Sequence, residues 1–427
     1  MKYNKQNEKI ELITDDFLVI GIDVGSETHF ARAFNNRNVE YSKKPYAFNN
    51  TAEGFRAFES WAVGIAKEHK KKYFITGMEP TGHYWFNLGD YIRSHGMILV
   101  HVNTAAVKKA KEIDDNDPKK SDPKDPKTIA GLVNRGSYSF PYIPEGIYAE
   151  IRELMNQRGR VNSEMTAVKN RLARWFSIYF PEFQEVYKHT DSKTGMMILK
   201  EYPLPSDIVK LGVEGIVKVW RDNKVRGAGQ KRAQKLYDAA KKSIGRTEAS
   251  KAVRMEFVNL ISDLSRCGER MDQIMEMVEE LLAEVPNAEK LLKIKGVGIV
   301  TAMMFIAEVG DISRFNDPKE IQKLGGLSIV ENSSGKHQGQ YSISYRGRKR
   351  LRYALFELAI SLIGRNEEFA SLHEYYTKRE KNPLKKLQSV IAVSCKVIRV
   401  FFKILKDGVE YDPIRMAQDI KRISPAQ

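Results

Sequence analysis

A chain of 427 residues is long enough for two or three domains, each with its own hydrophobic core. No apolar run reaches the roughly 18 residues of a membrane span, the N-terminus lacks the apolar core of a secretion signal, and two cysteines are too few for a disulfide framework or a cysteine-built zinc site, so we expect a cytosolic protein. The net charge of +16 favours an anionic polymer as partner, with nucleic acid as the leading candidate and a ribosome-associated or membrane-surface protein as alternatives.

The first 130 residues predict alternating strands and helices. The apolar stretch 17–36 predicts a two-strand hairpin, and residues 39–50 are typical of a third strand. Residues 51–70 carry apolar side chains at helical spacing, with Thr51 in the position of an N-cap. Two more strands, "KYFITGMEPTG" and "GMILVHVN", flank the helical segment "YWFNLGDYIRSH". Three strands, a helix, a strand, a helix and a strand is the order of a ribonuclease-H-like domain.

Two carboxylates accompany these apolar strands. Asp23 lies inside "GIDVG", where a carboxylate costs free energy unless it is paired or bound to a cation; a turn-capping aspartate is the alternative. Glu79 follows a second apolar strand in "ITGMEPTG", and in such a fold the adjacent parallel strand would bring its carboxylate near Asp23. Because neighbouring carboxylates repel each other, Mg²⁺ is the usual reason for holding them together.

Further carboxylates occur in "EIDDNDPKKSDPKDPKTIAGL". Asp122 and Asp125 are three residues apart, so on a helix both would lie on one face and could bind the same ion. A solvated acidic loop is the alternative, because prolines punctuate the segment. The same segment holds three additional candidates: Asp114, Asp115 and Asp117.

The middle of the chain predicts two long helices. Apolar residues follow a 4-3 rhythm from Ile147 to Trp175, interrupted by Arg158, and again from Val253 to Val285. The simplest arrangement is an antiparallel hairpin with residues 180–245 as a basic helical module at its tip; a seam between subunits is the alternative. Part of this module, "RDNKVRGAGQKRAQKLYDAAKKSIGR", has nine Lys or Arg against two Asp. That charge suits contact with a nucleic-acid backbone, or else marks a solvated helix face.

The last third begins with a glycine turn between two apolar helical stretches, in "LLKIKGVGIVTAMMF". Lys295, Gly296 and Gly298 occupy this turn. A helix, a glycine-hinged turn and a second helix can direct backbone N–H groups at one DNA phosphate.

Two adjacent serines then precede a cationic segment in "SSGKHQGQYSISYRGRKRLR". Ser334 lies between Ser333 and Gly335, on the loop leading to a helix predicted from about Gly347. The loop and the start of the helix supply six cations for phosphate: Lys336, Arg346, Arg348, Lys349, Arg350 and Arg352. The alternative is a polar loop leading into a basic surface helix.

Together these motifs resemble the DEDD transposases of the insertion-sequence one-hundred-and-ten group, which includes the Piv-type DNA invertases. The resemblance covers nearly the whole chain in the right order: "GIDVG", "GMEPTGHYW", an acidic pair, "IKGVGIVTA" and the "SSG" segment. It implies a RuvC-like metal domain over residues 1–140 and a coiled-coil connector over 141–288 with the inserted module at 180–245. A mainly helical transposase domain with a helix-hairpin-helix-like element follows over 289–427.

The resemblance also implies the chemistry. Ser334, whose glycine neighbour matches the family's "SG" signature, would be the nucleophile, and Asp23, Glu79, Asp122 and Asp125 would hold Mg²⁺, with Mn²⁺ as a substitute. The partners would be donor and target DNA, an element-encoded bridge RNA and further copies of the chain in a homodimer or homotetramer, with no membrane. One departure concerns the acidic pair, because proline follows both Asp122 and Asp125 where the family usually continues a helix.

Three other classes of protein fit parts of the same pattern. A RuvC-like nuclease would use Asp23 and its partners to activate water, with Ser334 as an ordinary loop residue. A carboxylate-only DDE-type transposase would likewise need no serine. A non-catalytic nucleic-acid-binding scaffold would tolerate the loss of every carboxylate.

Overall fold

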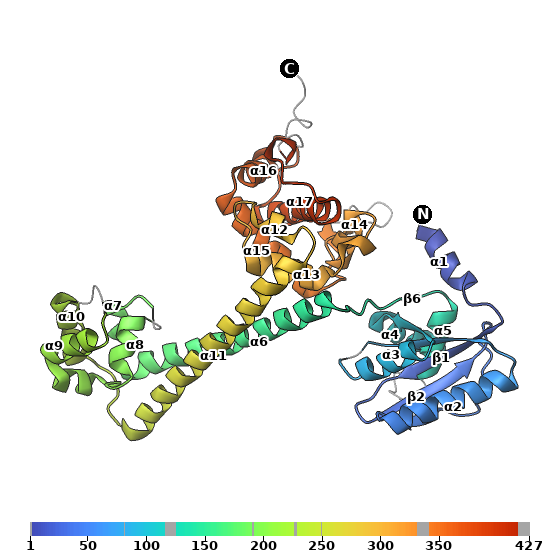
Figure 1. The fold of residues 1–427 in the computed structure, drawn as a ribbon, viewed down its shortest axis with the longest axis horizontal. Coiled ribbons are helices and arrows are strands. Elements are labelled where there is room, and N and C mark those ends of the chain that lie inside the picture. Colours follow the sequence, from blue (N-terminus) through green and yellow to red (C-terminus); the bar gives the residue numbers. More distant parts are fainter. Residues whose placement is uncertain are drawn as a thin grey trace, which may run out of the picture. The chain divides into compact units, whose positions relative to one another are not determined.

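The computed structural model describes residues 2–80, 82–115, 125–189, 192–225, 229–248, 250–330 and 341–416 (Figure 1). Within it the chain divides into two units, residues 1–143 and 144–427. The first is a mixed α/β unit and the second is mostly helical, which confirms the predicted fold class at this level. The predicted three-domain division stays a prediction.

The first unit is built on a six-stranded sheet with the order β3-β2-β1-β4-β5-β6. The strands are β1 (Phe17–Asp23), β2 (Thr28–Phe34), β3 (Tyr46–Asn49), β4 (Tyr73–Met78), β5 (Ile98–Val102) and β6 (Tyr138–Ser139). β1, β2 and β3 pair antiparallel, whereas β1, β4 and β5 pair parallel. This topology is compatible with the predicted ribonuclease-H-like domain. The short β6, which pairs antiparallel with β5, was not predicted.

Helices cover both faces of this sheet. They are α1 (Lys2–Glu11), α2 (Ala52–Glu68), α3 (Trp85–Ser94), α4 (Thr104–Asp115) and α5 (Asp125–Asn134). α2 begins at the predicted cap, since the Thr51 side chain accepts a hydrogen bond of 3.1 Å from the Gly54 amide. Strand residues alternate between the faces: Leu18 and Ile20 pack in the core with α2 and α3, and Val19 packs in the core with α5.

Two glycines let α5 lie close against the sheet. Gly21 and Gly77 pair with each other on the parallel strands β1 and β4. A Cβ at Gly21 would overlap the carbonyl oxygen of Pro126, and one at Gly77 would lie 2.5 Å from the Val133 side chain. The first turn of α5 therefore rests directly on the carboxyl-terminal half of β1.

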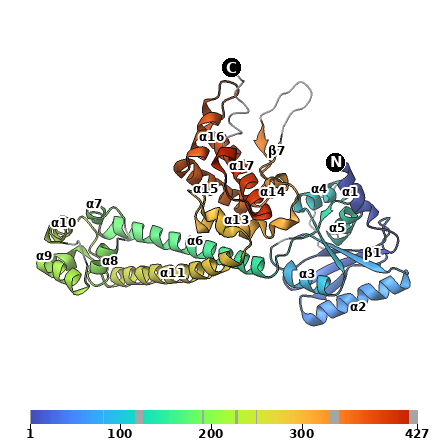
Figure 2. The same cartoon turned by 45° about the horizontal axis from the view of Figure 1, so that its top comes forward.

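The second unit contains two long helices, α6 (Ile147–Tyr179) and α11 (Ser250–Glu284), that run antiparallel side by side (Figures 1 and 2). The Trp175 indole N–H donates to the Val253 carbonyl at 3.2 Å, and Arg270 forms an ion pair with Glu164 at 2.6 Å. The structure thus pairs the two predicted helices within one chain. A coiled-coil winding of the pair stays a prediction.

A small helical module joins the far ends of α6 and α11 (Figure 2). Its helices are α7 (Phe183–Val186), α8 (Lys193–Leu199), α9 (Pro205–Asp222) and α10 (Gln230–Lys241). Trp220 and Leu236 are fully buried in a core that the module shares with the ends of the long helices. The module begins and ends at one point, because the Arg246 amide donates to the Ile178 carbonyl at 3.0 Å.

The remaining elements form the C-terminal part of the second unit. They are α12 (Ala288–Leu292), α13 (Ile299–Val309), a 3₁₀ turn (Ile312–Arg314), α14 (Pro318–Leu324), β7 (Ile329–Val330), β8 (Ser342–Ile343), α15 (Lys349–Arg365), α16 (Glu367–Lys378) and α17 (Lys386–Asp407). α15 and α17 contact each other and share one core with α13 and the adjoining ends of α6 and α11. No helix in the described part of the chain is long and apolar enough to cross a bilayer.

Candidate active site

Asp23 and Glu79 lie at the same edge of the sheet. Asp23 is the last residue of β1, and Glu79 directly follows β4. Because Ile22 pairs with Met78 in the parallel register, the next residues, Asp23 and Glu79, are neighbours at the carboxyl ends of the two strands. Both are two residues beyond a glycine that faces α5, so their side chains belong to the α5 face of the sheet. Each is partly exposed.

Asp125 is the first residue of α5, the helix seated on this face. Its carboxylate is 13% exposed and forms an ion pair with Lys111 of α4. The neighbouring residue, Pro126, lies against Gly21, two positions before Asp23. The fold therefore directs Asp23, Glu79 and Asp125 to one edge and one face of the sheet.

The remaining acidic candidates cannot be placed beside these three. Asp117 and Asp122 lie outside the described residues, and only the backbone of Asp114 and Asp115, at the end of α4, is described. Within the ranges that the structure covers, no group of three or more His, Cys, Asp or Glu side chains is gathered closely enough to hold a metal ion. Carboxylate oxygens are nevertheless the donors that Mg²⁺ prefers, so the chemistry of the predicted set fits that ion.

Two histidines flank this edge and add no positive charge to it at neutral pH. Burial lowers the pKa of His29, which lies on β2 beside the residue that pairs with Asp23. Burial also lowers the pKa of His101, on β5, to about 4. Both imidazoles are neutral at pH 7, whereas the Lys111 ammonium brings a positive charge to Asp125 through its ion pair.

In the sequence, the predicted nucleophile falls between the short strands β7 and β8. Ser333, Ser334, Gly335 and Lys336 are within residues 331–340, outside the described residues. The flanking strands β7 and β8 are antiparallel, with Ile329 opposite Ile343. This pairing, which the sequence did not predict, brings Ile329–Val330 and Ser342–Ile343 together shortly before α15.

The cationic residues after this segment divide into two groups. Arg348 donates to the Glu308 carbonyl at 2.6 Å, Arg350 donates to the Met155 carbonyl at 3.0 Å, and Arg352 donates to the Gly325 carbonyl at 2.8 Å. These three arginines tie α15 to α13, to α6 and to the turn after α14. By contrast, Arg346 and Lys349 are exposed, and neither has a hydrogen-bond or ion-pair partner among the residues that the structure covers.

The predicted glycine turn lies between α12 and α13. Gly296 has a φ of +101°, and its carbonyl accepts a hydrogen bond of 2.7 Å from the Ser361 hydroxyl of α15. Gly298 is the N-cap of α13, and a Cβ at this position would meet no atom within 4 Å. Lys295 is exposed beside them. The turn thus presents an open helix start and one cation to solvent.

Comparisons with known proteins match the two segments of the chain that contain the predicted site residues. Residues 20–181, which contain all four predicted carboxylates, match the IS110-type DEDD family model described as "Transposase". Residues 288–376, which contain the serine segment and the cations, match the "Transposase IS116/IS110/IS902 family". The chain belongs to the IS110 family of transposases.

Individual relatives of this IS110-family transposase are distant in sequence. The insertion element IS116 uncharacterized 44.8 kDa protein of Streptomyces clavuligerus is 23% identical over 93% of this chain and 97% of its own length. The insertion element IS110 uncharacterized 43.6 kDa protein of Streptomyces coelicolor is also 23% identical, over 69% of this chain and 72% of its own. The transposase for insertion sequence element IS1111A of Coxiella burnetii is 26% identical over 35% of this chain and 41% of its own.

Sequence reasoning missed two charged residues of this IS110-family transposase that hold predicted site residues. Lys111 pairs with Asp125, and Glu308 lies 3.6 Å from Arg348 and 3.7 Å from Arg350. Glu308 could have been found, because it is a single carboxylate within the apolar helix "IVTAMMFIAEV" and such a residue needs a partner. Lys111 lies among other lysines in "KKAKE", where no pattern distinguishes it.

Proposed function

We propose that this transposase cleaves and rejoins DNA through a covalent serine–phosphate intermediate, assisted by Mg²⁺ at the carboxylate edge of the first unit. The observation that carries the proposal is the placement of Asp23 and Glu79 at adjacent strand ends, on the face against which Gly21 seats α5 and therefore Asp125. Asp122 would complete the set. The family assignment links this edge to the serine segment of the second unit.

The carboxylates would act by binding the metal ion. Asp23, Glu79, Asp125 and Asp122 supply hard anionic oxygens, which suit Mg²⁺ and also Mn²⁺. When bound, the ion would supply stabilisation of negative charge on the reacting phosphate and would favour loss of the serine proton. If Asp125 bound the ion, its ion pair with Lys111 would break. The Lys111 ammonium could then contact the DNA backbone.

The serine would act as the nucleophile. Its Oγ attacks a DNA phosphorus, the new bond is an Oγ–P ester, and the bond to the neighbouring deoxyribose oxygen breaks. The serine proton leaves to solvent or a base, and the departing strand end takes up a proton as a free hydroxyl. Attack by a hydroxyl of another strand on the phosphoserine reverses these steps, so that rejoining needs no external energy source. Exposed Arg346 and Lys349 would hold the phosphate backbone beside this segment.

Sequence choice would come from an RNA guide. The chain has a net charge of +16 but no recognisable base-reading module such as a zinc finger in its sequence. Base pairing of a bridge RNA with donor and target DNA would supply the missing readout while the protein holds backbones. Exchange of four DNA strands would need two or four copies of the chain. RNA that co-purifies with the expressed protein, once sequenced, would identify such a guide; a nuclease-treated protein with full target choice would exclude it.

The serine mechanism is tested by trapping the intermediate. Ser334→Ala should retain nucleic-acid binding but lose both strand cleavage and recombination. Protease digestion and mass spectrometry of the trapped wild-type reaction should place a nucleotide adduct on Ser334. Ser333→Ala is the matched control and should remain active; an adduct on Ser333 would move the assignment by one residue. Efficient recombination by the double variant would reject the serine mechanism in favour of a water-activating nuclease or a DDE-type transposase.

A further inference from the structure

A small polar cavity opens on the outer side of α5, away from the sheet. Its volume is about 190 Å³, and its lining includes Asn38, Lys127, Thr128, Gly131 and Arg135. None of these residues was singled out in the sequence. The cavity lies on the same helix as Asp125, with Gly131 six residues further on, which is about 9 Å along the helix axis.

Two cations stand at the cavity on one side of α5. Lys127 and Gly131 are four residues apart on α5, which ends at Asn134. Arg135 directly follows the helix, and its amide still donates to the Gly131 carbonyl at 3.2 Å, which continues the row with the glycine in the middle. Both cations are exposed, and neither side chain has a hydrogen-bond or ion-pair partner in the described ranges. The opposite side of the same helix, including Ile129 and Val133, is fully buried against the sheet. The row therefore offers two positive charges across a hollow, neither of them paired with a described side chain.

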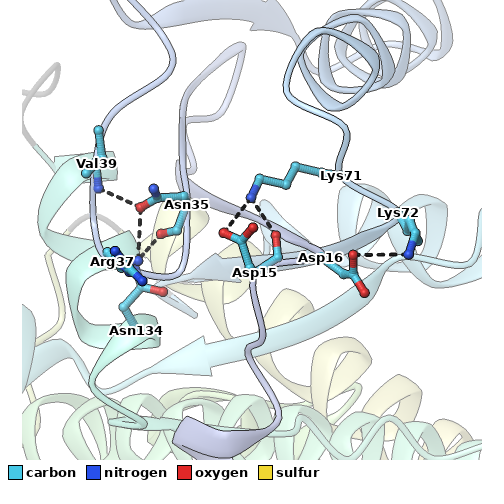
Figure 3. Close-up of polar contacts among 8 residues, drawn as sticks. All are labelled: Asp15, Asp16, Asn35, Arg37, Val39, Lys71, Lys72 and Asn134. Carbon is cyan, nitrogen blue, oxygen red and sulfur yellow. Dashed lines mark hydrogen bonds and ion pairs between the residues drawn. The ribbon is translucent and has the colours of Figure 1, made fainter.

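The turn after β2 forms another wall of the cavity and is held in place by hydrogen bonds. The Asn35 side chain accepts from the amides of Arg37 and Val39, both at 2.9 Å, and Asn134 of α5 donates to the Asn35 carbonyl at 3.0 Å (Figure 3). Asn134 also donates to the side-chain oxygen of Asn38 at 3.3 Å. Because that oxygen already accepts a bond, the Asn38 amide nitrogen remains as a donor at the cavity. Asn38 is held in a left-handed conformation with a φ of +63°.

Gly131 forms the floor, and internal packing does not require a glycine there. A Cβ at Gly131 would meet only the Asn38 side chain, at 3.7 and 3.8 Å, which is ordinary contact. A glycine in the middle of a helix nevertheless costs roughly 0.5–1 kcal/mol relative to alanine. Gly131 itself is buried, and its missing Cβ leaves space at the floor of the cavity beside the Asn38 side chain.

We infer that this cavity binds one phosphate of the DNA strand that the transposase acts on. A phosphate matches the donor set, since Lys127, Arg135 and the Asn38 amide can all donate to anionic oxygens. Among the described side chains that line the hollow, none is acidic. DNA is the source because the cavity is on the helix that carries Asp125, so the inference rests on the proposed function of that edge. The site positions the strand and carries no sequence information.

Binding without catalysis tests the site independently of the proposed reaction. Fluorescence anisotropy with a labelled DNA duplex in EDTA should show weaker binding by Lys127→Gln and by Arg135→Gln, with the slope of log affinity against log salt reduced by about one for each. Lys67→Gln removes an exposed cation from α2 and should leave both quantities unchanged. Equal losses in all three variants would show a general charge effect and overturn the site. Loss of cleavage activity alone, with unchanged binding, would also overturn it.

Gly131→Ala separates a binding role from a structural one. The added methyl group should raise the thermal midpoint through helix propensity while weakening DNA binding, because it covers the floor of the cavity. Gly64→Ala is the matched control: Gly64 is an exposed glycine in the middle of α2 with no atom near its missing Cβ, so stability should rise and binding should not change. Unchanged DNA affinity in Gly131→Ala would contradict the inference.

Two further probes identify the source of the phosphate. An RNA hairpin and inorganic phosphate are tested with the same variants under the same conditions. If the substitutions at Lys127 and Arg135 weaken RNA binding but leave DNA binding unchanged, the site serves RNA and the inference is wrong. Stabilisation of wild-type protein by inorganic phosphate, with DNA affinity indifferent to the same substitutions, would assign the cavity to a free anion and would likewise overturn it.

Discussion

Single carboxylates at strand ends carry the proposed chemistry. Asp23→Asn and Glu79→Gln remove one charge each without changing size, so we expect folded proteins that no longer cleave DNA in Mg²⁺. Asp16→Asn is a suitable control, because Asp16 lies just before β1 in an exposed ion pair with Lys72 at 3.2 Å (Figure 3). Strand cleavage at the wild-type rate by both site variants would remove the metal-site proposal.

Asp125→Asn should have the same effect as these two, and its structure gives an additional readout. The substitution breaks the ion pair with Lys111 and exposes an uncompensated ammonium at the carboxylate edge. If Asp125 instead serves only that pair, Lys111→Gln should lower stability as much as Asp125→Asn does, and cleavage should survive in both. A double-mutant cycle on stability and on cleavage distinguishes the two roles.

The cations near the serine segment should behave as two groups. Arg346→Gln and Lys349→Gln should weaken nucleic-acid binding and flatten its salt dependence at unchanged stability, because both side chains are exposed and without partners in the described structure. Arg348→Gln and Arg352→Gln should instead destabilise the second unit by about 1–2 kcal/mol, since each removes a hydrogen bond to a backbone carbonyl. Chemical denaturation and salt titrations check both halves; identical behaviour of all four variants would contradict the division.

At the scale of elements, the contact between α5 and β1 determines whether the candidate site assembles. Gly21→Ala would place a methyl group on the Pro126 carbonyl, so we expect α5 to shift and the unfolding free energy of the first unit to fall by about 1–3 kcal/mol. Cleavage should fall as well, because Asp125 moves with the helix. Thermal unfolding measures the first effect. A Gly21→Ala protein as stable and active as the wild type would show that α5 is not seated in this way.

The elements that repeat a pattern over many residues were predictable from the sequence. The 4-3 rhythm identified α6 and α11, and apolar runs identified β1, β4 and β5. The two-residue strands β6, β7 and β8 carry too few residues for any period to appear. Their pairing depends on contacts between segments far apart in the sequence, which local pattern does not encode.

The candidate site was predictable in residue type and, for Asp23 and Glu79, in arrangement. A carboxylate in an apolar strand drew attention to Asp23, and strand order placed Glu79 beside it. The sequence did not reveal which cations anchor α15 and which are exposed. That division depends on backbone carbonyls of α6 and α13, which come close to α15 only in the folded chain. The cavity beside Gly131 was missed for the same reason, since Asn38 and Lys127 meet there only in the folded unit.

For the whole molecule, the division into two units predicts that each folds alone. Residues 1–143 enclose a core on each face of their own sheet, and residues 144–427 enclose two helical cores. Fragments cut at this boundary should each unfold cooperatively, as circular dichroism on heating would measure. A fragment 1–143 that shows no cooperative transition would mean that the first unit depends on the second.

The hydrogen bond between Ile178 and Arg246 has a consequence for insertions and deletions. The end of α6 and the segment that leads into α11 meet at this hydrogen bond, so the module between them is an insertion whose two ends lie together. An insertion or deletion within such a segment leaves the register of the helices on either side unchanged. The length of the module can therefore change while α6 and α11 keep their pairing.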